Sequence, residues 1–322
     1  MKFFYRPMFR LVPDGTRIRF MNGRYAGLIV SAVLSVASVL LFFYPGLNLG
    51  LDFRGGVVMQ VATPQKPDFA KLRAALTAQH LPGASLQSFG HDQGVLISLE
   101  SRDNAAATQQ SLHAARAAVD QSLPGARILS TQAVGASVSA QLFQQGLLAL
   151  GLSFLMILVY IWFRFEWQFA VGAVVTLLLD VTKTIGFMVI TRIPFDLVTI
   201  AAILTIIGYS TNDKVVVYDR MRENLRKYKT MPLRELIDLS INETLNRTLG
   251  TSGTVFLAAL PLALFGGTAL SGFAWIMLFG IVVGTSSSIF IAAPILLFLG
   301  EHRLRRGTAK PADAATSVTA SR

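Results

Sequence analysis

Residues 203–223 read ILTIIGYSTNDKVVVYDRMRE, an apolar run interrupted by charge. The run acquires the polar sequence GYSTNDK at 208–214 and then returns to valines. An ionised side chain left in bilayer hydrocarbon costs roughly 2.5 to 3.5 kcal/mol, so charge inside a membrane helix indicates a functional site. The stretch therefore predicts a membrane-spanning helix with a functional polar patch.

The composition around this stretch is that of an integral membrane protein. Of the 322 residues, 52% are hydrophobic and only 15% are charged. A helix needs about 20 predominantly apolar residues to cross the hydrocarbon layer. Six segments come close to this length: 25–44, 142–163, 169–190, 197–217, 250–265 and 273–299. The chain is therefore expected to form a bundle of six transmembrane helices, five of them within residues 142–300.

Basic residues mark one side of the membrane. They gather in the leader at 1–24, in the connector at 220–234 and after residue 302, which all lie on one side if six spans alternate. Cytoplasmic loops carry the excess of Lys and Arg, so both termini are expected in the cytoplasm. This topology accounts for the net charge of +11, and no nucleic-acid partner is expected. The first apolar run ends in FYPG rather than in a small-residue cleavage site, which indicates an uncleaved span.

Residues 45–141 differ in character, with charges of both signs, alanines and turn residues. Their pattern predicts strand 57–62, helix 68–80, strand 84–89, strand 95–99, helix 104–123 and strand 126–133. This βαβ–βαβ order is typical of the ferredoxin-like fold. The segment is expected to be a small external α+β domain, on the periplasmic side.

Two further stretches are expected on the cytoplasmic side. The connector 219–248 has apolar residues at three- and four-residue spacing, which predicts an amphipathic helix lying along the membrane face. The tail 301–322 has no large apolar residue after Arg306 and is expected to be disordered.

Two charged side chains fall deep within the third span. Asp180 lies about 16 Å into the helix at 1.5 Å per residue, close to the bilayer centre. Lys183 follows one turn later, so the two can form an intrahelical ion pair. The pair is interpreted either as a self-neutralising structural contact or as part of a proton relay.

A second candidate site lies at the polar patch itself. Asp213 sits near the cytoplasmic end of the fourth span, and Arg247 precedes the fifth span at a similar depth. A neighbouring guanidinium favours the carboxylate and motion apart favours its protonation, which suits a proton relay. Ser210, Thr211 and Asn212 can hold water beside Asp213. The alternative is an interfacial salt bridge that anchors two helix ends.

The remaining polar features indicate packing rather than chemistry. Lys214 points another way around its helix and is expected to snorkel to the interface. Gly280-x-x-x-Gly284, followed by TSSS at 285–288, predicts close helix packing in the last span. There is no cysteine, and the four histidines lack the spacing of a zinc site. Neither enzyme chemistry nor a cofactor or metal is expected.

Short motifs stand in a specific order along nearly the whole chain. They are LGLDFRGG at 49–56, VGASV at 134–138, FRFEW at 163–167, GYSTND at 208–213 with YDRMREN at 218–224, and RTLGTSG at 247–253. In these motifs the chain resembles the SecF family, the smaller membrane subunits of the bacterial SecD–SecF pair. The resemblance implies an RND-type bundle, in which proton flow moves external domains, and it places Asp213 and Arg247 on the proton pathway.

The resemblance also implies a function. It is that of an accessory subunit of the Sec protein translocase in the bacterial inner membrane, which uses the proton motive force to promote late steps of polypeptide export. The implied partners are a SecD-like subunit, a SecYEG-type channel, the bilayer, and the exported unfolded polypeptide that the external domain helps to handle. Two other hypotheses stay open: half of an RND-type exporter of small molecules or lipids, and a purely structural translocase subunit.

Overall fold

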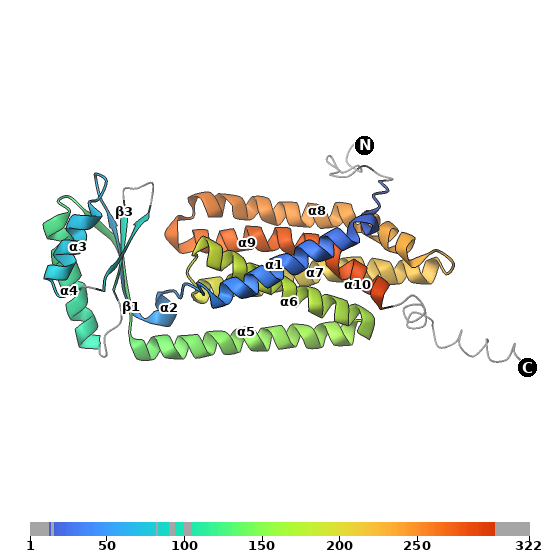
Figure 1. Ribbon diagram of the computed structural model, residues 1–322, viewed down its shortest axis with the longest axis horizontal. Coiled ribbons are helices and arrows are strands. Elements are labelled where there is room, and N and C mark those ends of the chain that lie inside the picture. Colours follow the sequence, from blue (N-terminus) through green and yellow to red (C-terminus); the bar gives the residue numbers. More distant parts are fainter. Residues whose placement is uncertain (1–12, 14–15, 82, 90–93, 100–104, 300–322) are drawn as a thin grey trace, which may run out of the picture.

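The computed structural model describes residue 13 and residues 16–299, except 82, 90–93 and 100–104. This part of the chain has two regions, a small sheet domain and a long helical bundle that leads away from it (Figure 1). The tail predicted to be disordered and most of the basic leader lie outside the described residues.

The sheet domain has the predicted order of elements. It consists of β1 (Gly56–Ala62), α3 (Phe69–Ala78), β2 (Ser85–Phe89), β3 (Gly94–Leu99), α4 (Ala105–Ser122) and β4 (Arg127–Val134). The four strands pair antiparallel in the order β2-β3-β1-β4. Both helices lie on one side of this sheet (Figure 1). The ferredoxin-like prediction is confirmed.

Alternation along β1 builds the core of this domain. Val57, Met59 and Val61 are buried and pack against Leu72 of α3, because successive side chains of a strand point to opposite faces. Asp68 caps α3, its carboxylate accepting the backbone N–H groups of residues 70 and 71 at 2.9 and 3.1 Å. The alternation of apolar residues in the sequence of β1 therefore matches the residues that are buried in the domain.

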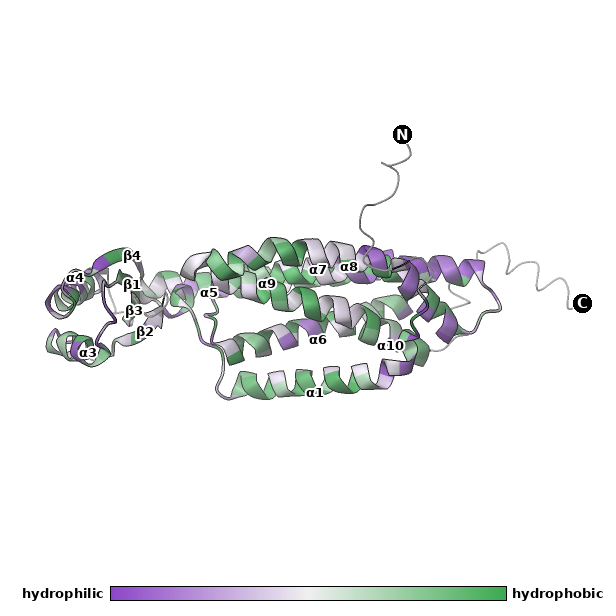
Figure 2. Ribbon diagram, turned by 90° about the horizontal axis from the view of Figure 1, so that it is seen from above, coloured by the Kyte–Doolittle hydropathy of each residue, from purple (hydrophilic) through white to green (hydrophobic). Residues whose placement is uncertain are grey.

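The bundle contains six helices long and apolar enough to cross a membrane. Its elements are the turn η2 (Phe20–Gly23), α1 (Arg24–Phe43), α5 (Ala136–Arg164), α6 (Trp167–Thr191), α7 (Leu197–Lys227), α8 (Leu233–Phe265), α9 (Gly267–Ser287), the π-helical segment η3 (Ser288–Ala292) and α10 (Ala293–Phe298). Hydrophobic colour runs along the bundle, and hydrophilic colour gathers at the end where α7 turns into α8 (Figure 2). Only 11% of the apolar window of α5 is buried, against 56% for α7. Helix α5 is therefore exposed on the outside of the bundle, and α7 lies inside.

The connector after α7 is built differently from the prediction. Helix α7 continues to Lys227, and α8 starts at Leu233 and runs unbroken through the fifth span. The apolar residues expected to face the membrane pack instead on the extension of α7, with Ile237 and Leu225 in one buried cluster. Asn224 also donates to Ser240 at 3.0 Å across the two helices. The expectation of a separate helix along the membrane face is therefore wrong, and the two helices form a hairpin.

The exit from the first span is a tight turn. The short helix α2 (Leu51–Arg54) is followed by Gly55 and Gly56 with φ of +70° and +120°, values that favour glycine, and β1 begins at once. The Gly50 N–H donates to the Phe195 carbonyl at 2.8 Å, which fastens this turn to the loop before α7.

The two glycines of the last span let α9 approach α7. A Cβ added to Gly280 would lie 2.3 Å from Cδ1 of Ile206, and one added to Gly284 would lie 3.0 Å from Oγ of Ser210. The predicted close packing is confirmed, and it brings α9 within reach of the polar patch on α7.

Gly280→Ala is expected to destabilise the bundle by about 1 to 3 kcal/mol, because the added methyl overlaps the buried side chain of Ile206. Thermal unfolding of the detergent-purified chain measures the loss. Gly151→Ala is the matched control, since nothing lies within 4 Å of its added Cβ. Equal melting temperatures for the two variants would contradict the tight contact.

Candidate functional site: a buried charge array

Polar side chains from three elements converge on Asp180 in α6. Its Oδ2 accepts hydrogen bonds from Lys214 Nζ at 2.9 Å and from the hydroxyls of Ser210 at 2.8 Å and Ser287 at 2.7 Å. Its Oδ1 lies 3.6 Å from Lys183 Nζ, which confirms the predicted intrahelical pair. None of these side chains belongs to a residue more than 6% exposed. Asp180 is therefore held between two lysines inside the bundle.

A second carboxylate, Asp213, lies beside this cluster. Asp213 is 4% exposed, and its Oδ2 accepts a hydrogen bond from Ser288 Oγ at 3.1 Å. Ser288 follows Ser287 in the chain, so two consecutive hydroxyls of the last span contact the two buried carboxylates. Through them the last span links Asp180 to Asp213.

The helix changes its winding between these two serines. Helix α9 ends at Ser287, and the π-helical segment η3 starts at Ser288. Such one-turn insertions alter the direction of the side chains around them and are frequent at functional sites. Here the change occurs where one hydroxyl must reach α6 and the next must reach α7.

We call Asp180, Asp213, Lys183 and Lys214 the buried charge array. With all four side chains ionised the array is neutral, with two acids against two bases. A proton added to either acid leaves one uncompensated positive charge, which is costly in a medium of low polarity. The four side chains therefore compensate one another's charge only while both acids are ionised.

The polar side chains of α7 that were expected around Asp213 point in different directions. Ser210 donates to Asp180 rather than standing beside Asp213. The Thr211 hydroxyl is buried and has no hydrogen-bond partner within the described part of the chain. Asn212 is exposed on the outer face of α7. The expected polar shell around Asp213 is thus only partly formed, and Ser288 takes its place.

Arg247 does not contact Asp213. Its side chain is exposed, and no hydrogen bond or ion pair joins it to another described residue. The next residue, Thr248, is only 2% exposed, and consecutive helical residues project about 100° apart, so Arg247 points away from the packed face of α8. The Asp213–Arg247 contact expected from antiparallel geometry is therefore absent from the structure of this chain.

Three residues of the site were not recognised in the sequence. Lys214 was expected to snorkel, which is wrong: it is 2% exposed and pairs with Asp180. Its position four residues after Ser210 was a usable signal, because the two share a helix face. Ser287 and Ser288 were assigned to packing alone, although they also contact the buried carboxylates.

Comparison with known proteins agrees with this architecture. Residues 114–302 match the family model of the protein export membrane protein SecD/SecF, C-terminal, and residues 40–63 match the SecD/SecF GG motif. The protein translocase subunit SecF of Rickettsia akari is 43% identical over 297 residues, which cover 91% of this chain and 96% of that protein. The chain belongs to the SecF family. The SecF subunit of Cereibacter sphaeroides is 42% identical over 304 residues, covering 91% of this chain and 93% of the relative.

Solved structures extend the comparison to the fold. The crystal structure of SecDF from Thermus thermophilus, described as a translocon-associated membrane protein, matches with a TM-score of 0.81 and 31% identity over 91% of this chain. A second SecDF structure, in a super-membrane-facing form, matches with a TM-score of 0.60 at 31% identity over 97% of this chain. This chain spans about 40% of the length of those SecDF chains. As a SecF-family member it is a multi-pass membrane subunit for protein transport and not an enzyme.

Proposed function

We propose that the chain uses the proton motive force to promote late steps of polypeptide export across the bacterial inner membrane. The observation that carries this proposal is the buried charge array, whose acids and bases are held in the middle of the bundle by Ser210, Ser287 and Ser288. Asp213 is the group that takes up and releases the proton, because both lysines form ion pairs with Asp180, whereas Asp213 accepts a hydrogen bond from the hydroxyl of Ser288. Asp180 stays ionised during this cycle and compensates the positive charge of the two lysines.

The protonation cycle reaches the external domain through two connections. Helix α5 leads directly from β4 along the length of the bundle (Figure 1). Phe53 of α2 packs against Phe143 of α5 and Phe195, with ring centroids 5.4 Å apart in both contacts. A shift of α6, α7 or α9 that follows protonation therefore moves the sheet domain, which handles the emerging unfolded polypeptide.

A SecD-like subunit completes the site from outside the chain. Arg247 and Asn212 lie on the exposed faces of adjacent helices, where a polar group is costly against lipid. Half-transporters place their ion site at the interface of two repeats. The partner covers this face and gives Arg247 its counter-charge, and the complex acts on a SecYEG-type channel. Arginines and lysines gather where α7 turns into α8, so that end of the bundle faces the cytoplasm, and both termini belong to the cytoplasmic side.

Export into inverted membrane vesicles tests this proposal. Vesicles with the translocase, with or without the complete complex, receive an imposed proton or sodium gradient, and the translocated fraction of a preprotein is measured. A proton gradient is expected to increase export only when the complex is present. Equal export with and without the gradient would favour a purely structural subunit, and movement of lipids or small molecules instead of polypeptide would favour the exporter hypothesis.

A further inference from the structure

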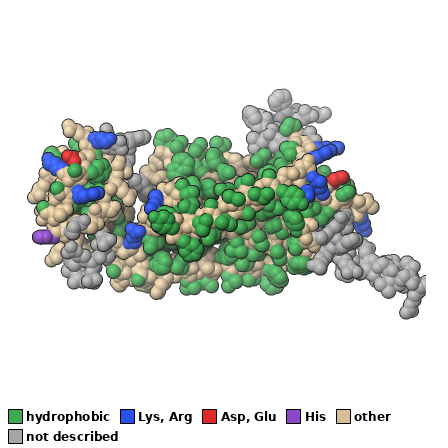
Figure 3. Space-filling model, viewed as in Figure 1, with side chains coloured by type: hydrophobic (Ala, Val, Ile, Leu, Met, Phe, Trp, Pro, Cys, Tyr) green, Lys and Arg blue, Asp and Glu red, His purple; other side chains and the backbone are tan. Residues whose placement is uncertain are grey.

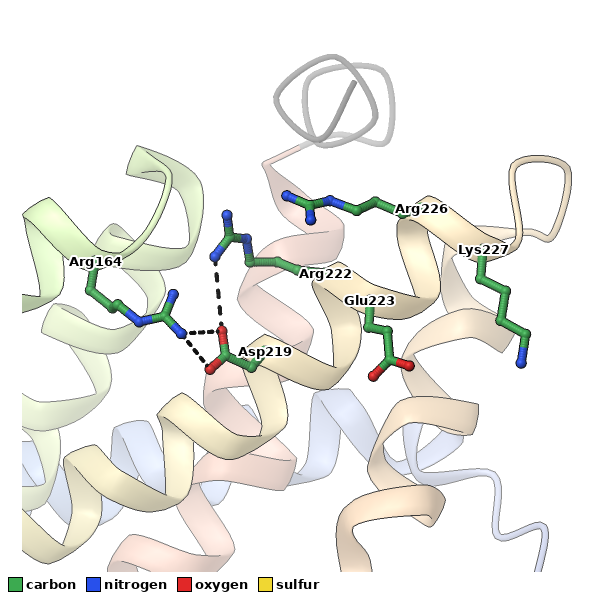
Figure 4. Close-up of a pocket in the computed structure, with 6 residues that line it drawn as sticks. All are labelled: Arg164, Asp219, Arg222, Glu223, Arg226 and Lys227. Carbon is green, nitrogen blue, oxygen red and sulfur yellow. Dashed lines mark hydrogen bonds and ion pairs between the residues drawn. The ribbon is translucent and has the colours of Figure 1, made fainter. Parts of the chain in front are cut away.

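Two motifs that the buried charge array does not use meet at the far end of the bundle. Arg164, from FRFEW, ends α5, and Asp219, from YDRMREN, lies on α7. Arg164 Nη2 donates to both carboxylate oxygens of Asp219, at 2.9 and 2.7 Å. This contact closes one side of an open pocket of about 530 Å³, lined by Arg164, Asp219, Arg222, Glu223, Arg226 and Lys227 (Figure 4).

The pocket has more cations than available carboxylates. Asp219 is occupied by Arg164, and Glu223 is bound by Arg220 at 2.6 Å. Arg222 is left with ion pairs at 3.8 Å to Glu166 and Asp219, too long for hydrogen bonds, and its buried Nε has no acceptor. Arg226 is exposed and has no hydrogen-bond acceptor among the described residues.

The guanidinium groups of Arg222 and Arg226 lie on the same side of α7 (Figure 4). The side chains of Arg222 and Arg226 extend toward the end of α5, whereas those of Glu223 and Lys227 point away from it (Figure 4). The Glu166 carboxyl opposes an anion here, although burial raises its pKa against the lowering effect of Arg222 and Arg226. Two planar donors directed at one space fit the oxygens of a phosphate.

The residues around the pocket indicate which phosphate compound fits it. Trp162 and Phe163, the two residues before Arg164, are 60% and 86% exposed. Hydrophobic side chains cover the middle of the bundle, and Lys and Arg lie at its ends (Figure 3). Aromatic residues are enriched at the membrane interface, and basic pockets between helices there bind anionic headgroups. A ligand with an anionic phosphate and acyl chains matches both the pocket and the apolar face beside it.

We propose that the pocket between the end of α5 and α7 binds the headgroup of an anionic phospholipid through Arg222 and Arg226. The acyl chains lie along the exposed face of α5, next to Trp162 and Phe163. The lipid holds the end of α5 against α7, whether or not the array carries protons, so this site is independent of the proposed export function.

Lipid titration of the delipidated, detergent-purified full chain tests the site. Binding of phosphatidylglycerol is followed by native mass spectrometry and by melting temperature, beside phosphatidylcholine with the same acyl chains and inorganic phosphate alone. Phosphatidylglycerol is expected to bind at least about tenfold more tightly than phosphatidylcholine, since phosphatidylcholine has the same phosphate but adds a quaternary ammonium that the arginines of the pocket repel. Arg226→Gln should weaken phosphatidylglycerol about tenfold, and Arg226→Lys, which keeps the charge, should weaken it less.

Lys229→Gln is the matched control, because it removes one exposed charge three residues away and outside the pocket. Its affinity for phosphatidylglycerol should equal that of the wild-type chain. Equal binding of the two lipids, or an unchanged affinity in Arg226→Gln, would overturn the proposal. Inorganic phosphate that binds alone and displaces the lipid would also overturn it, by making the pocket a site for a free anion.

Discussion

Asp213→Asn is expected to abolish the stimulation of export by a proton gradient while the complex remains assembled. Asparagine has nearly the same shape and still accepts the hydrogen bond from Ser288, which is 3.1 Å from Asp213 Oδ2. It cannot take up a proton, so the cycle proposed for this residue stops. The measurement is preprotein translocation into inverted vesicles, with and without an imposed gradient.

Two comparisons make this result specific. Asp120→Asn removes an exposed carboxylate from α4 of the sheet domain and should leave the stimulation intact. Co-purification of the partner subunit with Asp213→Asn shows whether assembly survives. If the variant assembles and its export still responds fully to the proton gradient, Asp213 is not the proton carrier.

The sheet domain was predictable because its signals are local. In each strand and helix the apolar residues repeat at the spacing of that element, and turn residues separate the elements. Short windows of sequence are therefore enough to predict β1 to β4. The hairpin of α7 and α8 was not predictable in this way. Apolar residues such as Leu236 and Ile241 at helical spacing suit either a membrane surface or a neighbouring helix, and the packing on α7 decides between them.

The same distinction explains the site. The Asp180–Lys183 pair spans less than one helical turn, so spacing alone indicates it. Lys214 and Ser287 are 34 and 107 residues away from Asp180, and only the packing of α6, α7 and α9 brings them together. The predicted contact between Asp213 and Arg247 rested on their similar depth in antiparallel helices. It is wrong because depth does not fix the direction in which a side chain points.

Loss of Asp180 is expected to cause the largest change in stability. Asp180→Asn leaves Lys183 and Lys214 inside the bundle with Asp213 as the sole remaining acid of the array. Removing one partner of a buried ion pair typically costs about 3 to 5 kcal/mol, because an uncompensated charge remains. The free energy of unfolding in a mixed detergent series, or the melting temperature of the purified chain, measures the loss.

A second substitution tests whether uncompensated charge causes this loss of stability. Lys214→Met in the Asp180→Asn background returns the array to one acid and one base, and methionine fills much of the volume of the lysine stem. The double variant is therefore expected to recover most of the lost stability, with a coupling energy of about 2 kcal/mol or more between the two sites. Additive losses, or a loss below about 1 kcal/mol in Asp180→Asn alone, would mean that Asp180 does not compensate the lysines. A neutral array in the resting state is what allows one added proton at Asp213 to unbalance it, so charge compensation at Asp180 is the condition on which the proposed cycle depends.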